Sequence, residues 1–523
     1  MAGWLNLGEM LKVNAKKYPD RTAFCDAQRS FTYPQCNTRV NGLANALVSM
    51  GLARGDRVAL FMENSIEMAE FFLAAAKTGM VIVPINFRLV ADEIEYIVNN
   101  SGARAMVVDE EFLPEVEKTR KNLKGIAGKL FIVNGQEQPG WISLDQVTAG
   151  ADPSEPVCDV TPEETWIHIY TSGTTGKPKG VLRSHRSHTA FYLINAVEFK
   201  FHENDVCMNV MPLCHINSTY YTFTFTYLGA SAYIHPARSF QPKEILSIIE
   251  KNGITFISLI PTHYNLILNS GIDREQYDVS SIEKLLCSSA PVRKEMKKAI
   301  MGFFPGVALY EAYGSTEAGI VTILKPEDQM RKLGSIGYEV VGSDLIKLLD
   351  DHGREVAKGE VGELYSRSPM LFDGYFNLPE KTAGAFSGRW FSAGDMAVAD
   401  EDGFFSIVDR KDNMIITGGE NVYPSEVEEV VADHPSVFDC ACIGLPHEKW
   451  GEKIVVFAVP SPAMDKEELD GEAIRTFCRK RLAGYKVPKQ IVAIASEKMP
   501  RTPTGKILHR KLREQKLQGD QGK

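Results

Sequence analysis

Thr171–Gly180 reads TSGTTGKPKG and places three glycines, four hydroxyl side chains and two lysines within ten residues. It follows Trp166–Tyr170 (WIHIY), a short apolar and partly β-branched run that predicts a buried strand. Glycines let the backbone approach an anion closely and adopt positive φ. Successive N–H groups and hydroxyls donate to phosphate oxygens, and lysine supplies charge. The pattern predicts a phosphate-binding loop, and an ordinary polar surface turn is the alternative.

This loop differs from the nucleotide loop of P-loop NTPases. That pattern requires a glycine five residues before the Gly-Lys pair and a Ser or Thr after it. Here Thr171 stands five residues before Gly176, and Pro178 follows Lys177. Pro178 also prevents a helix from starting directly at the lysine. The sequence therefore predicts a phosphate-binding loop of another class.

The composition is that of a globular protein with a large core. The chain has 523 residues, which corresponds to roughly two to four domains. It is 44% hydrophobic and 24% charged. The net charge of −9 and the isoelectric point of about 5.8 argue against nucleic acid as a partner, because nucleic-acid-binding proteins usually carry a basic surface. A local basic groove for an anionic cofactor remains compatible with these values.

The cysteine pattern and the apolar runs indicate a cytoplasmic location. Nine cysteines are scattered without a CxxC pair, which favours reduced thiols over a disulfide framework or a zinc site. Cys440 and Cys442 lie in an apolar run and are expected in a strand core. The first twenty residues lack the long apolar segment of a signal peptide. Phe71–Ile85, the most apolar run, is too short and interrupted to span a bilayer, so no transmembrane segment is predicted.

Alternating strand and helix patterns predict an α/β fold with two lobes. In the first lobe, strands are expected at Arg57–Glu63, Val81–Pro84 and Ala105–Val108, with helices at Ser65–Thr78 and Ala91–Asn99. A helix is also expected over residues 4–20. In the second lobe, strands are expected at Val206–Met211, Thr255–Ile260, Ile282–Cys287 and Ala308–Tyr313. Each of these ends in small or polar residues, and ligands bind at the carboxyl ends of strands in such sheets.

The pattern changes after about residue 335. Short strands separated by Gly/Asp turns, at Asp344–Leu349, Gly362–Arg367 and Gly403–Val408, predict a small β-barrel over about 335–410. From residue 411 the chain has its own β and α pattern, with strands at Asp439–Gly444 and Lys453–Val459 and a helix near 470–482. We therefore expect a large N-terminal domain of two α/β lobes plus the barrel, residues 1–410. A small α+β C-terminal domain follows, residues 411–523.

Four further stretches carry groups suited to nucleotide chemistry. Tyr313–Glu317 (YGSTE) offers an aromatic ring, two hydroxyls and a carboxylate that could bind Mg²⁺. Trp390–Asp395 (WFSAGD) places a carboxylate after a predicted tight turn, suited to ribose hydroxyls. Gly418–Pro424 (GGENVYP) has a glycine pair that lets a thin ligand pass close to the backbone. Pro500–Lys506 (PRTPTGK) ends in a lysine. Each stretch by itself is also compatible with an ordinary turn or a solvent-facing side chain.

Together and in this order, these stretches resemble the adenylate-forming (ANL) superfamily of acyl-CoA synthetases, luciferases and peptide-synthetase adenylation domains. The resemblance rests on YTSGTTGKPKG, YGSTEAG, the GD of WFSAGD, DRKDN with GGENVYPSEVE, and PRTPTGK, and it covers residues 5–512. It implies an AMP-forming carboxylic acid–CoA ligase that uses ATP, Mg²⁺ and coenzyme A. A carboxylate first attacks the α-phosphorus of ATP and releases pyrophosphate. The thiol of coenzyme A then displaces AMP.

The resemblance also implies the residues of the nucleotide site. Glu317 would bind Mg²⁺, Thr316 the α-phosphate, and Tyr313 would stack on adenine. Asp395 and Arg410 would hold the ribose hydroxyls. The remaining ATP or AMP contacts would be Thr171, Ser172, Gly173, Thr174, Thr175, Gly176, Lys179, Ser289, Ala290, Pro291, Gly314, Ser315 and Lys506.

A mobile C-terminal domain is implied for catalysis. Lys506 would bridge the attacking carboxylate and the α-phosphate, and the domain would then rotate at the hinge residue Asp412. This rotation would withdraw Lys506 and bring the CoA-binding residues Gly418, Gly419 and Glu420 to the pantetheine tunnel. His215 would act at the gate between the acyl pocket and the tunnel. The catalytic residues are thus expected to be Lys506, His215, Thr316 and Glu317.

The acyl pocket is expected to accept a compact acid. Its residues would be His215, Ile216, Asn217, Tyr220, Ser288 and Gly314. Their mixture of polar, aromatic and small groups favours an aromatic, alicyclic or short- to medium-chain acid over a long fatty acid. Two departures from the common family pattern are serines at 288 and 289, where many relatives have Gly-Gly, and Ala393 in place of threonine. Neither departure removes a catalytic group.

Other functions remain open at this level. A stand-alone adenylating enzyme would load a carrier-protein thiol in place of coenzyme A. The chain also resembles carnitine/crotonobetaine-CoA ligases, although no acidic residue stands out in the pocket to receive a trimethylammonium group. A catalytically silent binding protein is disfavoured because Lys179, Glu317 and Lys506 are all retained. A small-molecule acid, ATP and coenzyme A are the expected partners, and a homodimer is left open.

Overall fold

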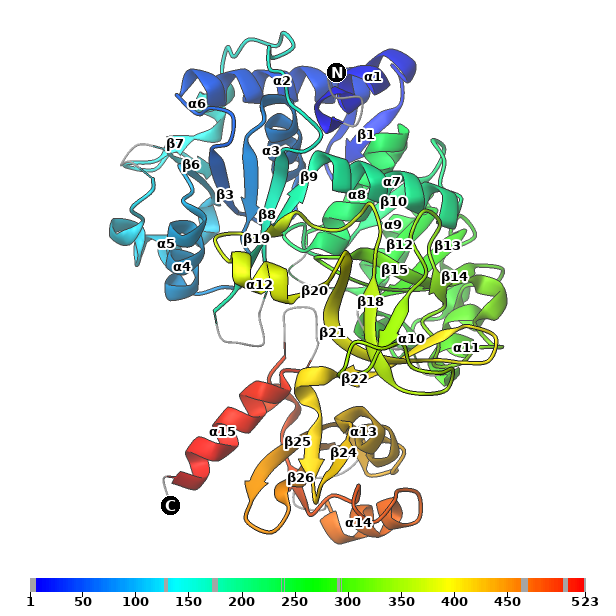
Figure 1. Ribbon diagram of the computed structural model, residues 1–523. Helices are drawn as coiled ribbons and strands as arrows, with labels where there is room; N and C mark the ends of the chain where they lie inside the picture. Colours follow the sequence, from blue (N-terminus) through cyan, green and yellow to red (C-terminus); the bar gives the residue numbers. More distant parts are fainter. Residues whose placement is uncertain are drawn as a thin grey trace. The chain divides into compact units, whose positions relative to one another are not determined.

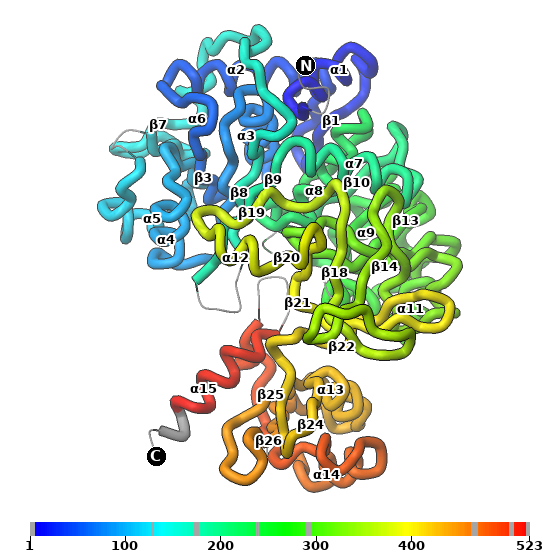
Figure 2. Tube along the Cα trace, in the orientation of Figure 1, coloured from blue at the N-terminus to red at the C-terminus, as the bar shows by residue number. Residues whose placement is uncertain are grey.

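The described chain forms two compact units. The computed structural model describes residues 6–126, 130–171, 177–236, 238, 240–288, 292, 294–461, 469–501 and 507–521 (Figures 1 and 2). The first unit contains the residues up to Leu345 together with Ser366–Phe391. The second contains Ile346–Tyr365 and the residues from Ser392 onward. The sequence predicted a different boundary, between a domain of residues 1–410 and a domain of residues 411–523 that rotates at Asp412. This boundary stays a prediction.

An eight-stranded sheet forms the first lobe of the first unit. Its order is β19-β9-β8-β4-β3-β5-β6-β7, and the pairs from β4 through β7 are parallel. The predicted βαβα alternation is confirmed. The strands are β3 (Arg57–Phe61), β4 (Val81–Pro84), β5 (Ala105–Asp109), β6 (Phe131–Asn134), β7 (Ile142–Ser143), β8 (Thr165–Thr171), β9 (Lys179–Ser184) and β19 (Gly374–Tyr375). The helices are α2 (Tyr33–Ser49), α3 (Ile66–Thr78), α4 (Ala91–Ser101), α5 (Leu113–Glu117), α6 (Leu144–Thr148) and α12 (Pro379–Gly384).

Local signals explain the ends of these helices. Helix α3 begins after Ser65, whose side chain accepts a hydrogen bond from the Met68 N–H, and it ends at Gly79 with φ of 71°. Helix α2 begins with a capping box between Thr32 and Gln35. The helix expected over residues 4–20 is shorter. Because a 3₁₀ turn precedes it, α1 spans only Met10–Lys17.

A nine-stranded sheet forms the second lobe. Its order is β16-β15-β14-β13-β12-β10-β11-β1-β2, with parallel pairs from β14 through β11 to β1. The strands are β1 (Thr22–Cys25), β2 (Ser30–Thr32), β10 (Val206–Asn209), β11 (Ser231–Ile234), β12 (Phe256–Leu259), β13 (Lys284–Ser288), β14 (Ala308–Ser315), β15 (Gly319–Leu324) and β16 (Tyr338–Glu339). The helices are α7 (His185–Phe199), α8 (Ile216–Leu228), α9 (Pro242–Asn252), α10 (Pro261–Leu268) and α11 (Lys294–Phe303).

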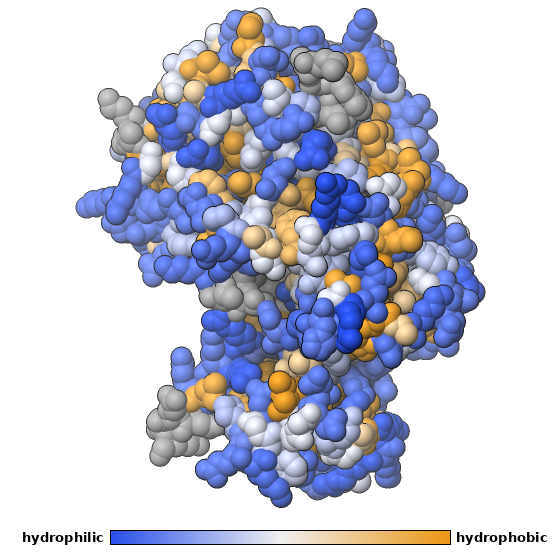
Figure 3. Space-filling model, viewed as in Figure 1, coloured by the Kyte–Doolittle hydropathy of each residue, from blue (hydrophilic) through white to orange (hydrophobic). Residues whose placement is uncertain are grey.

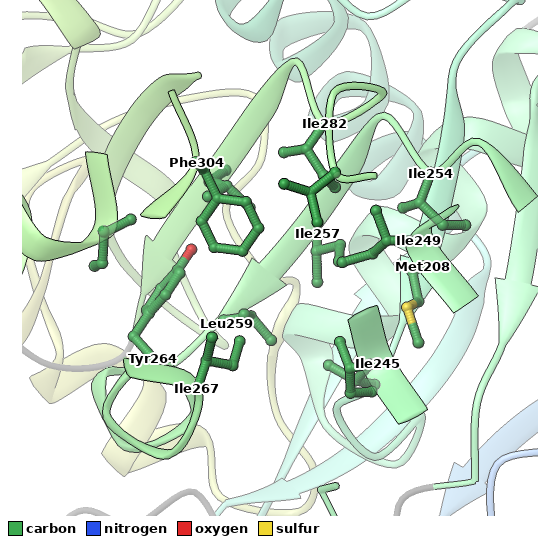
Figure 4. Close-up of a cluster of buried hydrophobic side chains, with 14 of the residues drawn as sticks. Met208, Ile245, Ile249, Ile254, Ile257, Leu259, Tyr264, Ile267, Ile282 and Phe304 are labelled. Atoms are coloured by element: carbon green, nitrogen blue, oxygen red, sulfur yellow. The ribbon is translucent and has the colours of Figure 1, made fainter. Parts of the chain in front are cut away.

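The two faces of this second sheet differ in polarity. One face packs its apolar side chains, including Met208, Ile257 and Leu259, against isoleucines from the helices that cover it (Figure 4). Side chains alternate between faces along a strand. The next residue after Met208 is Asn209, and the residue between Ile257 and Leu259 is Ser258. The polar side chains therefore lie on the opposite face, where helix α8 contacts β10 and β12.

The second unit contains two β-sheets, a half-barrel and a C-terminal sheet with both antiparallel and parallel pairs. A half-barrel sheet is formed by β17 (Lys347–Leu349), β18 (Gly362–Ser366), β21 (Trp390–Ala399) and β22 (Phe405–Arg410), and β20 (Phe386–Ser387) pairs with the first residues of β21. The C-terminal sheet consists of β23 (Ile415–Thr417), β24 (Glu420–Val422), β25 (Val437–His447), β26 (Gly451–Pro460) and β27 (Gln490–Ala493). Its helices are α13 (Pro424–Ala432), α14 (Gly471–Arg479) and α15 (His509–Gln521). Cys440 and Cys442 are buried in β25, as expected.

The visible surface is mostly hydrophilic, with scattered apolar side chains (Figure 3). Among the described residues, no helix has both the length and the apolar character needed to cross a bilayer.

Several histidines are buried in the first unit. Burial lowers the pKa of His185 to about 4, and burial together with Arg57 lowers the pKa of His168 to about 3. Burial also holds the pKa of His188 well below its usual range. These imidazoles stay neutral in the folded protein, whereas the unfolded chain would protonate them near pH 6.5. Their linkage therefore makes the folded state less stable as the pH falls from about 6.5 toward 4.

We predict that His188→Phe weakens this acid sensitivity. The His188 ring lies 4.9 Å from the Trp166 ring and 5.2 Å from the Tyr220 ring, and a phenyl ring keeps this aromatic packing. The slope of the unfolding free energy against pH should decrease by up to about 1.4 kcal/mol per pH unit below pH 6. Urea unfolding at several pH values between 5 and 7.5 measures this slope. Because burial raises the pKa of Asp109 to about 6 and opposes the trend, the variant is compared with the wild type. Equal slopes would contradict the prediction.

Candidate active site

The glycine-rich loop joins two paired strands. Thr171 at the end of β8 pairs with Lys179 at the start of β9, so the loop leaves and re-enters the sheet at one point. The Tyr96 hydroxyl donates to the Pro178 carbonyl at 3.0 Å, and Lys177 Nζ lies 5.3 Å from the Tyr96 ring. These contacts hold the base of the loop. The predicted phosphate ligands Ser172, Gly173, Thr174, Thr175 and Gly176 lie outside the described residues.

Gly180 is a glycine because of close packing. A Cβ atom at this position would lie 2.0 Å from His168 Nε2 on the neighbouring strand. The His168 ring stacks on Tyr170, with centroids 4.9 Å apart, and lies 4.7 Å from the Phe376 ring. The neutral imidazole thus fills the space beneath the loop.

A single tyrosine links the loop to the predicted magnesium ligand. Lys179 Nζ lies 4.5 Å from the centre of the Tyr375 ring. The Tyr375 hydroxyl donates a hydrogen bond to Glu317 Oε1 at 2.9 Å. Glu317 is half-buried. With one oxygen held by tyrosine, the carboxylate presents its second oxygen as a hard ligand of the kind that Mg²⁺ prefers.

The β14–β15 hairpin carries Thr316 and Glu317 in its turn. The Ser315 hydroxyl accepts a hydrogen bond from the Ala318 N–H at 3.0 Å. Gly314 packs so closely that a Cβ atom would lie 2.0 Å from the Gly319 carbonyl oxygen. Tyr313 and Gly314 thus lie at the carboxyl end of β14, as the sequence predicted.

A buried arginine holds this turn from below. Arg183 on β9 is fully buried, and its Nη1 donates to the Thr316 carbonyl at 3.0 Å and to the Glu317 carbonyl at 3.1 Å. The Phe372 N–H also donates to the Glu317 carbonyl, at 2.7 Å. Sequence reasoning did not identify Arg183. A charged residue at an inward-facing position of a buried strand is the signal that could have found it.

The predicted acyl-pocket residues gather at the start of α8. His215 precedes this helix, and its Nε2 lies 3.4 Å from Asn86 Nδ2. Burial and the nearby Arg88 lower the pKa of His215 to about 4, so its imidazole is neutral at pH 7. Ile216 and Asn217 follow in the first turn of the helix and are half-buried.

A chain of hydrogen bonds connects the helix to the sheet. Asn217 Nδ2 donates to Ser288 Oγ at 3.2 Å, and Ser258 Oγ donates to Asn217 Oδ1 at 3.0 Å. The two serine hydroxyls are 3.5 Å apart. Ser258 was not among the predicted residues. The neighbouring predicted residues Ser289, Ala290 and Pro291 lie outside the described residues.

Tyr220 connects the acyl side to the phosphate side. Its ring stacks on Phe191 with centroids 3.6 Å apart, and the Arg183 guanidinium lies 5.3 Å from it. The first unit therefore links Lys179, Glu317 and Thr316 to the pocket residue Tyr220 through contacts of Tyr375 and Arg183.

The remaining predicted residues lie in the second unit. Asp395 and Arg410 are register partners on β21 and β22, and Arg410 Nη1 lies 3.2 Å from Asp395 Oδ1. The tight turn predicted before Asp395 is wrong. Gly394 adopts φ of 83° without ending strand β21, because the sheet pairing continues on both sides of it.

The predicted CoA residues form a turn between β23 and β24. Gly418 and Gly419 have φ of 63° and 85°, which favour glycine, and Glu420 begins β24. The Gly418 N–H donates to the Trp450 carbonyl at 2.7 Å, and a Cβ atom on Gly418 would lie 3.3 Å from the Trp450 ring. The turn thus presents bare backbone beside an indole.

The predicted hinge residue lies in a short 3₁₀ turn. Asp412 is exposed within Lys411–Asn413. Asp409 fixes the turn, because its carboxylate accepts hydrogen bonds from Asn413 Nδ2 at 3.0 Å and from the Ser425 N–H at 2.8 Å. Asp409 was missed by sequence reasoning. The predicted Lys506 lies outside the described residues.

Two protein-family models match this chain and show the family to which it belongs. The model of the AMP-binding enzyme family matches residues 11–376, and that of the AMP-binding enzyme C-terminal domain matches residues 426–506. The chain belongs to the AMP-binding enzyme family. The predicted resemblance to the adenylate-forming superfamily is thereby confirmed.

The relatives of this family member include several CoA ligases and a fatty acid–[acyl-carrier-protein] ligase of Streptomyces coeruleorubidus. The chain is 33% identical to a long-chain-fatty-acid–CoA ligase of Mycobacterium tuberculosis over 524 residues, covering 98% of each chain. It is 34% identical to a feruloyl-CoA synthase of an Amycolatopsis species, covering 97% of this chain and 98% of the relative. The solved structure of the anthranilate CoA ligase AuaEII with anthranoyl-AMP is 30% identical, with a TM-score of 0.86 over 98% of this chain and 97% of that one. The protein is an AMP-forming acid–thiol ligase that acts on an acyl or aryl acid.

We predict that Arg183→Met destabilises the protein and weakens ATP use. The substitution removes the Arg183 donor from the Thr316 carbonyl, whereas the Glu317 carbonyl keeps the Phe372 N–H, so the unfolding free energy should fall by about 1–3 kcal/mol. The KM for Mg·ATP should rise, because the turn loses its support. Denaturant unfolding and steady-state kinetics measure the two effects.

Arg186→Met is the matched control. The Arg186 side chain is 43% exposed, and its Nη2 lies 3.5 Å from an Asp373 oxygen. An exposed ion pair of this kind contributes less than about 1 kcal/mol. Equal losses in the two variants would contradict the role of Arg183.

Proposed function

We propose that this ligase activates a compact carboxylic acid, either aromatic, alicyclic or of short to medium chain length. One observation carries the proposal. Tyr220, one of the predicted pocket residues, is buried and stacks on Phe191 with ring centroids 3.6 Å apart. Packed aromatic rings at this position favour a compact acid over a long alkyl chain. The feruloyl and anthranilate ligases among the relatives support an aromatic acid.

The first step joins the acid to AMP. A carboxylate oxygen attacks the α-phosphorus, a new O–P bond forms, the bond to the β-phosphate oxygen breaks, and pyrophosphate leaves. The main barrier is electrostatic, because an anion must approach a polyanion. Lys179 and the loop residues from Thr171 would hold the leaving phosphates, and Thr316 would donate to the α-phosphate. Bound through Glu317, Mg²⁺ would neutralise phosphate charge.

The second step makes the thioester. The sulfur of coenzyme A attacks the acyl carbon, the thiol proton is lost, the bond to the phosphate oxygen breaks, and AMP leaves. Asp395 and Arg410 would hold the ribose, and the Gly418–Gly419 turn would admit the pantetheine arm. The neutral imidazole of His215 would act as the gate rather than as a charged acid. Asp412 would be the hinge between the two steps.

The proposal also includes the expected location of the protein and the alternatives to coenzyme A and to the acid class. All nine cysteines are free thiols, which supports a cytoplasmic location. The pocket residues His215, Ile216, Asn217 and Tyr220 include no carboxylate, which disfavours a carnitine-type substrate. A carrier-protein thiol in place of coenzyme A and a homodimer stay predictions for experiment.

Pyrophosphate release across a panel of acids tests the proposal. Benzoates, cinnamates, alicyclic acids and fatty acids of increasing length are each assayed with and without coenzyme A. We expect the fastest release with a compact acid and AMP formation that depends on coenzyme A. A preference for long fatty acids would contradict the proposed acid class. Pyrophosphate release without thioester formation would indicate a carrier-protein thiol.

We predict that Lys506→Ala separates the two half-reactions. The variant should lose acid-dependent pyrophosphate release by at least about 100-fold, because the cation that neutralises the approaching carboxylate is removed. Thioester formation from supplied acyl-adenylate should be largely retained. The control Lys498→Ala removes an exposed lysine eight residues earlier and should retain both reactions. Equal loss of both half-reactions in Lys506→Ala would contradict the role.

A further inference from the structure

A small cavity lies between helix α8 and the polar face of the second sheet. Its volume is about 10 Å³, which is enough for roughly one water molecule. Polar groups from strand ends, Asn209 and Ser258, and from the helix, Asn217, Tyr221 and Thr222, line it. The cavity is also lined by Cys207, Met208, Val210, Met211 and Phe256, so its walls are partly apolar, and its polar groups can hydrogen-bond to one water molecule.

Three buried polar atoms at this cavity have no hydrogen-bond partner among the described residues. They are Asn209 Nδ2, Tyr221 Oη and Thr222 Oγ1. Their residues are only 5%, 4% and 0% exposed. A buried polar atom without a partner costs about 1–3 kcal/mol, and native proteins satisfy nearly all such atoms. A water molecule in the cavity would supply the partner that these three atoms lack.

The cavity shares two lining side chains with the hydrogen-bond chain of the predicted acyl pocket. Asn217 and Ser258 line the cavity and also form the hydrogen-bond chain with Ser288. The Asn217 side chain thus hydrogen-bonds to Ser288 in the pocket and also faces the cavity. The polar atoms at the two places belong to one network.

Strand register places the Ser258 end of this network well below the Thr316–Glu317 turn. Ser288 pairs with Ala312, two residues before Gly314, and Ser258 pairs with Leu286, two residues before Ser288. Four residues of strand correspond to roughly 13 Å at about 3.3 Å each. The Thr316–Glu317 turn lies beyond Gly314, at the carboxyl edge. The network thus forms the floor of the pocket, at the end remote from the acid's carboxylate.

We propose that the acid carries a hydroxyl or carbonyl oxygen at the end remote from its carboxylate. Asn217 and Ser258 receive this oxygen, and a water in the cavity passes the hydrogen bonds on to Asn209, Tyr221 and Thr222. The substrate class is thus an oxygen-substituted aromatic or medium-chain acid. This inference rests on the proposed function and narrows its acid class. A site built to bind a substrate oxygen rejects the analogue that lacks it, because its own polar atoms are then left unpaired.

Matched pairs of acids test the inference. The pairs are 4-hydroxycinnamate with cinnamate and 4-methylcinnamate, 4-hydroxybenzoate with benzoate, and 8-hydroxyoctanoate with octanoate. We expect kcat/KM for pyrophosphate release to be at least tenfold higher for the oxygenated member of the best pair. Equal or higher values for the plain acid in every pair would overturn the inference while the proposed ligase function stands. Pyrophosphate release with none of the acids would overturn the proposed function and the inference with it.

Substitutions of the cavity-lining residues test whether their polar side chains cause the preference for the oxygenated acid. Asn217→Leu and Thr222→Val should each reduce the preference for the oxygenated acid to within about threefold. Tyr221→Phe removes a single hydroxyl from the cavity with little change in shape, so it tests the cavity if Thr222→Val fails to fold. A preference that persists unchanged in Asn217→Leu and Tyr221→Phe would overturn the inference.

Thr226→Val is the matched control on the same helix. The Thr226 hydroxyl donates to the Thr222 carbonyl at 2.9 Å, and its residue is equally buried but lies outside the cavity lining. The control should retain both the activity and the preference of the wild type. A loss of preference in Thr226→Val as large as in Thr222→Val would show a general effect on the helix and would overturn the assignment.

Discussion

Two hydrogen bonds from one buried guanidinium join the strand after the glycine-rich loop to the turn that carries Thr316 and Glu317. A buried charge requires several partners, so the strand and the turn cannot shift independently. The same turn is held from the other side by Tyr375, which also lies against Lys179. Lys179 and the proposed magnesium ligand Glu317 are thereby held by one tyrosine, although they come from separate sheets of the first unit.

The second constraint is the pairing of buried polar groups on one face of the nine-stranded sheet. Its apolar face closes a core of aliphatic side chains, which needs no partner beyond dense packing. Its polar face, under helix α8, carries Asn209, Ser258 and Ser288 and can be stable only when each polar atom is paired. Asn217 satisfies part of this requirement. The atoms left over at the cavity give the pocket a chemical preference that packing alone would not give.

Much of the fold could be predicted because the local patterns are strong. The strand before the loop, expected at Trp166–Tyr170, spans Thr165–Thr171, and the strand expected at Ile282–Cys287 spans Lys284–Ser288. The predicted turn before Asp395 failed, because glycine after a serine and an alanine is typical of turns, whereas tertiary pairing with β22 keeps this segment in a strand. Arg183 was missed because its partners are backbone carbonyls more than 130 residues away, and Asp409 because its contacts with Asn413 and Ser425 form only when the turn folds.

The sequence by itself determined the family and the chemistry, because both depend on the order and spacing of short motifs whose residues act locally on phosphate, ribose and thiol. Only the tertiary structure decided which buried polar atoms meet. Arg183 and Thr316 are 133 residues apart, and Ser258 and Asn217 are 41 apart. Such contacts depend on strand order, register and the face to which each side chain points. A local pattern contains none of these three, and the polar floor of the pocket is therefore visible only in the folded chain.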